Sequence, residues 1–93
     1  MTISCAHIET VLRIEDIESL IEFGAPDNEY DSEAKEMFEL LERLDRGQFT
    51  EDGLVSVVSR VWGEMFDLDE EGVNKRMPAF RNVAKNILLA EGR

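Results

Sequence analysis

Residues 50–66 read TEDGLVSVVSRVWGEMF, and this stretch decides the fold class of the chain. Its apolar side chains recur in steps of three and four, and positions 54, 58, 61 and 65 form one stripe, as in a helix that buries one face. Thr50 is suited to cap the first turn, where Glu51 and Asp52 complement the helix dipole. The four valines favour a strand by propensity, which is the weaker signal. A helix over 51–66 spans about 24 Å, so we expect it to cross the whole molecule.

The same helical spacing occurs before this stretch. Residues 31–46 predict a helix whose N-cap is Asp31 or Ser32 and whose stop signal is Gly47. The first turns of this helix contain acidic residues, which the positive end of the helix dipole favours. We therefore expect a second amphipathic helix directly ahead of the valine-rich one.

Helical spacing also follows the valine-rich stretch. A last helix is expected to begin at Pro78, or at an earlier cap on Asn74, and to end at Gly92. Residues 69–75 can form one additional short turn of helix.

The N-terminal third has a less regular pattern. Its apolar residues favour one helix over 7–22, although the step from Leu12 to Ile17 interrupts the stripe. The first alternative is two shorter helices that meet near 13–16, with Asp16 as the second cap. A strand at 2–6 is a further alternative. The glycine and proline after Phe23 predict a turn-rich loop.

Length and composition are those of one globular domain over residues 1–93. A chain of 93 residues is too short for two independent cores. A hydrophobic fraction of 43% with 33% charged residues is the balance of a folded chain rather than a disordered one. Because short connections make sequential helices antiparallel neighbours, we expect an all-α fold, a compact bundle of about four helices.

The net charge of −11 limits the classes of partner. Nucleic acids and anionic membrane surfaces bind clustered Lys and Arg side chains, so neither is an expected partner. No stretch is apolar enough to span a membrane, and the N-terminus lacks the pattern of a signal peptide. One cysteine cannot form a disulfide within the chain, and the expected compartment is the cytoplasm.

The densest acidic window, residues 15–36, indicates a partner-binding surface. Acidic side chains keep a small protein soluble, and they also attract a basic partner over a long range. Phe23, Tyr30 and Phe49 offer aromatic anchors of the kind that interfaces bury within a charged rim. The expected partner-binding residues are Glu18, Glu22, Asp27, Glu29, Tyr30 and Asp31.

The patterns for catalysis or metal binding are weak. Cys5 and His7 are the only soft metal ligands, and residues two apart on a helix face different sides. The acidic run at 67–72 opens like an EF-hand loop, but Pro78 stands where the loop requires a glutamate. The acids at 27–33 lack the glycine of such a loop. We expect no enzyme activity and no cofactor. We interpret the run at 67–72 as a solvated acidic turn between helices, and weak binding of a divalent ion is the most that the acids at 27–33 indicate.

Residues 24–33 read GAPDNEYDSE and lead into the helix expected at 31–46. A Gly-x-Pro loop followed by a Tyr-Asp-x-Glu helix start resembles a small bacterial family of all-helical proteins of uncharacterised function. The resemblance implies a compact helical domain, and it implies no catalytic residues.

Together these patterns predict a non-enzymatic acidic domain that binds a basic protein, in the way that an inhibitor or immunity-type protein covers a nuclease. Two alternatives stay open. One is an oligomerising structural module, in which the acid-rich residues 1–72 of one copy meet the base-rich residues 73–93 of another. The other is a weak metal-binding protein.

Overall fold

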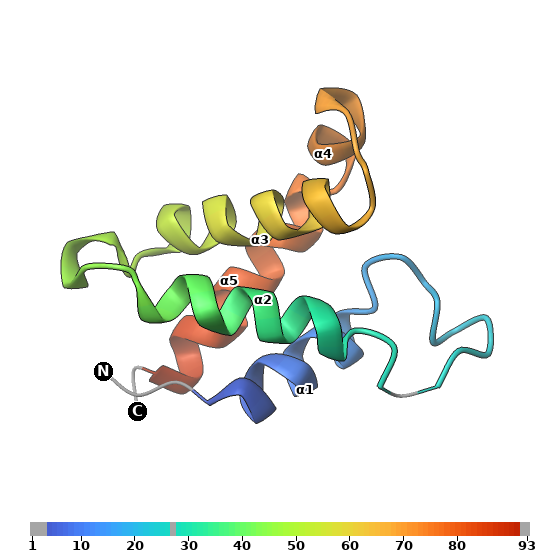
Figure 1. The fold of residues 1–93 in the computed structure, drawn as a ribbon, viewed down its shortest axis with the longest axis horizontal. Coiled ribbons are helices and arrows are strands. Elements are labelled where there is room, and N and C mark those ends of the chain that lie inside the picture. The colour runs from blue at the N-terminus through green and yellow to red at the C-terminus, as the bar shows by residue number, and fades with distance from the viewer. Residues whose placement is uncertain (1–3, 27, 92–93) are drawn as a thin grey trace.

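The computed structural model describes residues 4–26 and 28–91, and within these ranges every regular element is a helix (Figure 1). The α-helices are α1 (Cys5–Glu15), α2 (Asp31–Glu42), α3 (Glu51–Met65), α4 (Glu70–Lys75) and α5 (Met77–Glu91). A short 3-10 helix, η1, spans Arg46–Gln48. The expected all-α bundle is confirmed, with four longer helices and the short α4.

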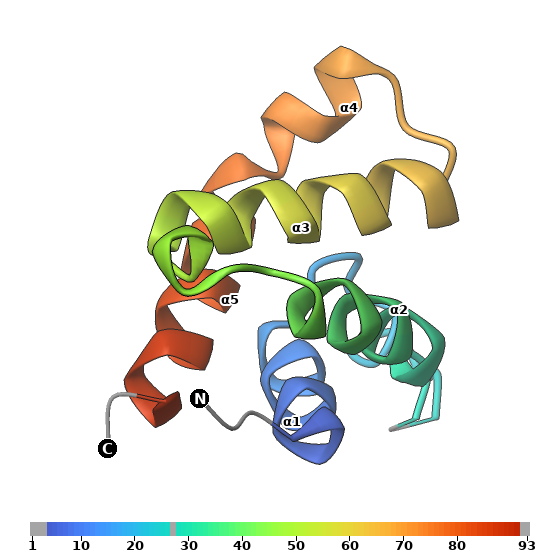
Figure 2. The same cartoon turned by 60° about the vertical axis from the view of Figure 1, so that its left-hand side comes forward.

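Helix α3 lies at the centre of the packing, because it contacts α2, α4 and α5. Helix α1 closes the bundle against α2 and α5, and α4 stands at the end of the molecule away from α1 (Figure 2). The buried side chains of α3 are Leu54, Val55, Val57, Val58, Val61 and Trp62. The stripe predicted from the valine-rich stretch is thus the middle of the core, apart from Met65 at its exposed end.

The expected Thr50 cap of α3 is confirmed, and the structure shows a similar cap at the start of α4. The Thr50 hydroxyl accepts a hydrogen bond from the Gly53 amide at 3.1 Å. The Asp69 carboxylate accepts one from the Gly72 amide at 2.7 Å. Both bonds satisfy amides that have no partner inside the first helical turn.

The expected single helix over 7–22 is wrong. Helix α1 ends at Glu15, and Asp16 adopts a left-handed backbone conformation with φ 46°. The Asp16 carboxylate accepts hydrogen bonds from the amides of Ile21 and Glu22, so it stabilises a series of turns in place of a second helix. The break lies where the two-helix alternative put it, near 13–16, but turns follow it. The strand alternative fails at Cys5 and Ala6, which are helical, while residues 2 and 3 lie outside the described part of the chain.

The boundaries of α2 also differ from the expected ones. Asp31 is its first helical residue, and the N-cap position belongs to Tyr30, which makes no side-chain capping bond. The helix ends at Glu42, with Arg43 as its C-cap, and the expected stop residue Gly47 lies five residues further on, inside η1. Helix α5 begins at Met77, one residue before the expected start, and Gly92 lies outside the described residues.

We predict that Gly53→Ala destabilises the protein although alanine favours helices. A Cβ at this position would overlap the backbone carbonyl oxygen of Gln48, which also accepts the Thr50 amide. Overpacking of this kind costs about 1–3 kcal/mol. The matched control is Gly63→Ala in the same helix, whose Cβ would meet Val73 Cγ2 at an ordinary 3.8 Å. This variant should be up to about 1 kcal/mol more stable than the wild type, because alanine favours a helix more than glycine does. Urea unfolding of both variants tests this prediction, and a stabilised Gly53→Ala protein would contradict it.

A second prediction concerns Glu33, which is 7% exposed. Burial, with the nearby charges of Glu29 and Asp31, raises the pKa of its carboxyl group. The ionised form is therefore penalised in the folded state, and the folded protein loses stability as the pH rises through that pKa. The stability of Glu33→Gln relative to the wild type should therefore increase between pH 4 and pH 8. This increase should reach about 1 kcal/mol, which is common when one unfavourable charge is removed. The control is the exposed Glu36→Gln on the same helix; equal pH dependence in both variants would refute the prediction.

Candidate functional site

The chain between α1 and α2 forms a projecting loop, residues 16–26, which we call the acidic loop. It extends to one side of the bundle, at the end where α2 begins (Figure 1). Asp16 closes its base, because one carboxylate oxygen accepts the Tyr30 hydroxyl at 2.6 Å while the other accepts the Glu22 amide at 2.9 Å. The Tyr30 hydroxyl in turn accepts the Glu18 amide at 3.1 Å. The loop is thus tied to the first residue before α2 by side-chain bonds.

Glu18 connects this loop to the far end of the chain. Its carboxylate accepts hydrogen bonds from Trp62 Nε1 at 2.9 Å and from Arg76 Nη2 at 2.8 Å, and Arg76 Nε binds the same carboxylate. The Glu18 side chain is 14% exposed. Arg76 also donates to the carbonyl of Gly72 in α4. One carboxylate therefore joins the loop, α3 and the junction between α4 and α5.

The aromatic rings of the core surround the same tryptophan. Trp62 stacks on Tyr30 with ring centroids 5.8 Å apart, and it meets Phe66 at 5.3 Å and Phe80 at 6.2 Å. Aromatic pairs at these separations stabilise a core beyond their buried area. Trp62 is fully buried and has its indole N–H satisfied by Glu18.

The network shifts the ionisation of its members. The Arg76 hydrogen bonds lower the pKa of Glu18, with a further contribution from Trp62 and against the effect of burial. Burial raises the pKa of Asp16, but the Tyr30 hydroxyl and the loop amides outweigh it, so the net shift is downward. Burial and the Asp16 carboxylate raise the pKa of Tyr30 well above its usual range. At neutral pH both carboxylates are therefore charged and the phenol is neutral.

The structure corrects two of the six expected partner-binding residues. Tyr30 is 1% exposed and belongs to the core, and Glu18 is committed to Trp62 and Arg76. Neither is available as a surface contact, because a buried phenol or carboxylate that loses its partners is costly.

Three of the other four expected residues lie on the surface. Glu22, Glu29 and Asp31 are exposed, and Asp27 lies outside the described residues. Of the expected aromatic anchors, Phe23 is 85% exposed near the middle of the acidic loop, while Phe49 is half-buried and packs against the core. The Asp16 carboxylate brings the Glu22 amide and the Tyr30 hydroxyl together, and so places the loop beside the start of α2. Glu22, Phe23, Glu29 and Asp31 together form the candidate site.

Sequence reasoning missed the residues that hold this site in place. The apolar pattern indicates Asp16 only as a cap in the two-helix alternative, and it indicates no site role for Trp62 or Arg76. The one available signal was Asp16, because it interrupts the apolar stripe of the N-terminal third. Nothing in the sequence near Arg76 indicates its partner, which lies 58 residues earlier.

The candidate cysteine and histidine do not form a reactive pair. Cys5 Sγ contacts Glu9 Oε2 at 3.9 Å. Burial and the Glu9 charge raise the pKa of the Cys5 thiol, which is the opposite of what a thiolate nucleophile or ligand requires. Within residues 4–26 and 28–91, no three His, Cys, Asp or Glu side chains are grouped so that they could hold a metal ion.

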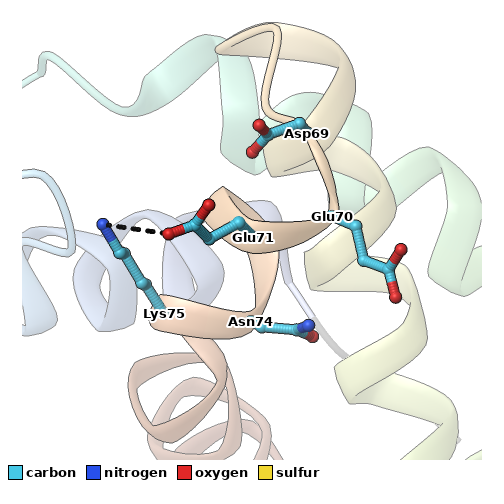
Figure 3. Close-up of a pocket in the computed structure, with 5 residues that line it drawn as sticks. All are labelled: Asp69, Glu70, Glu71, Asn74 and Lys75. Atoms are coloured by element: carbon cyan, nitrogen blue, oxygen red, sulfur yellow. Dashed lines mark ion pairs between the residues drawn. The ribbon is translucent and has the colours of Figure 1, made fainter.

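The acidic run at 67–72 is part of an open surface hollow on α4, with a volume of about 660 Å³ (Figure 3). Its lining residues are Asp69, Glu70, Glu71, Asn74 and Lys75. Glu71 points toward Lys75 and pairs with it at 3.8 Å, while Asp69 is occupied with its capping bond. The run is acidic and largely exposed, as expected, but only residues 67–69 lie between helices, because Glu70, Glu71 and Gly72 belong to α4.

The base-rich residues 73–93 are largely engaged within the chain. Arg76 pairs with Glu18, Lys75 with Glu71, and Arg81 with both Glu51 and Asp52. These pairs use most of the positive charge that the head-to-tail alternative assigned to a second copy.

No helix within the described residues combines the length and the apolar character that crossing a membrane requires. No protein-family model, curated protein or solved structure matches this chain. The resemblance of residues 24–33 to a bacterial helical family stays a prediction.

We predict that Glu18 makes folding stability sensitive to acid. Its pKa is lowered in the folded state, so its contribution is present above the pKa of an unfolded glutamate, about 4.3, and is lost as the pH falls through the folded value. Glu18→Gln should cost about 2 kcal/mol at pH 7, because hydrogen bonds to a charged group are lost. Chemical unfolding at pH 7, 5, 4 and 3 should show a smaller loss toward acid pH in the variant than in the wild type. Parallel curves for the two proteins would exclude this role of Glu18.

Proposed function

We propose that this protein is a non-enzymatic acidic domain that binds a basic protein through the acidic loop and the start of α2. The observation that carries the proposal is Phe23, which is 85% exposed on a loop whose base is held by hydrogen bonds. Single exposed apolar residues are common on protein surfaces. An aromatic ring presented on an anchored loop among carboxylates has the composition of an interface anchor within a polar rim.

The charges on the acidic loop and at the start of α2 support a basic partner. Glu22 precedes Phe23 in the loop, and Glu29 and Asp31 flank the buried Tyr30. The chain as a whole carries a net charge of −11. A field of one sign speeds the encounter with an oppositely charged protein and disfavours partners of like charge.

A small domain of this kind acts by covering the surface of its partner, as an inhibitor or immunity-type protein does. The partner's basic residues would approach the loop carboxylates, and an apolar hollow on the partner would take the Phe23 ring. A fixed loop loses less conformational entropy on binding than a flexible one. We further propose that the protein acts in the cytoplasm.

The test compares two triple charge reversals that change the net charge equally. The loop variant is Glu22→Lys, Glu29→Lys and Asp31→Lys, and the control variant is Glu39→Lys, Glu42→Lys and Asp45→Lys. All six side chains are exposed, and the control residues lie at and just beyond the opposite end of α2. Proteins retained from a native lysate by each immobilised variant are identified by mass spectrometry, and their Kd values are then measured by calorimetry.

We expect the control variant to retain the basic partner of the wild type and the loop variant to bind it at least tenfold more weakly. Phe23→Ala, which leaves the net charge unchanged, should also weaken binding about tenfold, or about 1.4 kcal/mol. Equal retention by the loop and control variants would end the proposal for this site.

A further inference from the structure

We propose that the Glu18–Arg76 ion pair is a latch that holds the acidic loop closed beside Trp62, and that the loop opens as a local unit while the helices stay folded. This inference concerns the fold itself and does not depend on the basic partner. It follows from how the loop is attached, how little of it is buried, and how its charges are balanced.

The attachment of the loop is concentrated in one polar network. Its side-chain bonds to the rest of the chain are those of Asp16 with Tyr30 and of Glu18 with Tyr30, Trp62 and Arg76. Arg76 supplies two of the bonds to the Glu18 carboxylate. Removing its guanidinium would leave the Trp62 indole as the only remaining partner of that carboxylate in this network.

The apolar residues of the loop contribute less to its attachment than the helices do to theirs. Ile17, Leu20 and Ile21 are only partly buried against the core. In α1, by contrast, Ile8 and Leu12 are fully buried. Segments with few buried apolar contacts open with a smaller free energy than the core, and they do so as contiguous units.

The backbone also favours the open loop once the latch is removed. Asp16 and Ser19 are held at φ 46° and 58°, a region that side chains other than glycine occupy at a cost. The groups that meet Glu18 are the Tyr30 hydroxyl from the start of α2, the Trp62 indole from α3 and the Arg76 guanidinium between α4 and α5. Within the described part of the chain, Arg76 is the one cation paired with it.

Acid acts on the latch in a defined direction. Protonation of Glu18 removes the charge that Arg76 binds, and protonation of Asp16 weakens its bonds to Tyr30 and to the loop amides. Both steps favour opening as the pH falls. Opening removes the Glu18 partner of the Trp62 N–H and exposes part of an indole that is otherwise fully buried.

The experiment uses Trp62, the only tryptophan of the chain, as a reporter of opening. Acrylamide quenching of its fluorescence and far-UV circular dichroism are measured for the wild type, Glu18→Gln and Arg76→Gln. The control is Arg81→Gln, which removes one arginine from exposed pairs with Glu51 and Asp52. We expect the Stern–Volmer constant to rise at least threefold in the two latch variants and to stay unchanged in the control, with the helical ellipticity retained in all. Unchanged quenching in latch variants that keep their helical ellipticity would overturn the proposal.

Hydrogen exchange of the wild-type protein decides the question even if a latch variant does not fold. The amides of Glu18, Ile21 and Glu22 bond to side chains of the network, whereas Val58 and Val61 lie in the middle of α3. We expect the three loop amides to exchange together, with protection factors at least 100-fold below those of the two valines, and faster relative to them at pH 4 than at pH 7. Equal protection of loop and α3 amides would show that the loop opens only with the whole domain, and would refute the latch.

Discussion

A charged carboxylate that is largely removed from water must be paired. In this protein that carboxylate is Glu18, and its partners connect distant parts of the chain. It is 14% exposed, and its partners come from α3 and from the junction of α4 and α5. Pairing it positions the loop that follows α1, because the Glu18 amide also binds the Tyr30 hydroxyl. Leaving such a group unpaired is costly. The pairing of Glu18 therefore fixes the positions of the loop, Trp62 and the junction of α4 and α5 relative to one another.

The surplus of acidic charge comes from the composition, because each ion pair removes one positive and one negative charge together. The chain has 21 acidic and 10 basic residues, and the described ion pairs engage Arg60, Lys75, Arg76 and Arg81 with carboxylates of the same chain. None of the described ion pairs includes Glu22, Glu29 or Asp31. The proposed docking residues therefore lie where the intramolecular pairs leave negative charge uncompensated.

Some elements could be predicted because their causes are local. The stripe of α3 and its Thr50 cap depend on residues within a few positions of each other, so spacing and residue type are sufficient. The end of α1 was harder to predict. The periodicity up to Ile21 favoured a longer helix, but the Asp16 carboxylate binds the Ile21 and Glu22 amides and stabilises turns instead. In the candidate site, charge alone correctly indicated Glu22, Glu29 and Asp31 as surface residues, and could not separate them from Glu18.

The amino-acid sequence by itself determined the helical class, the central helix and the excess of acidic charge, since each of these depends on composition or on short-range spacing. Only the tertiary structure decided which charges are inside. Glu18 meets Trp62 and Arg76 across 44 and 58 residues, and Tyr30 is buried because its ring stacks on Trp62 and its hydroxyl reaches Asp16. Contacts over such separations have no periodicity that a single sequence displays, because they depend on how the packed helices bring distant side chains together.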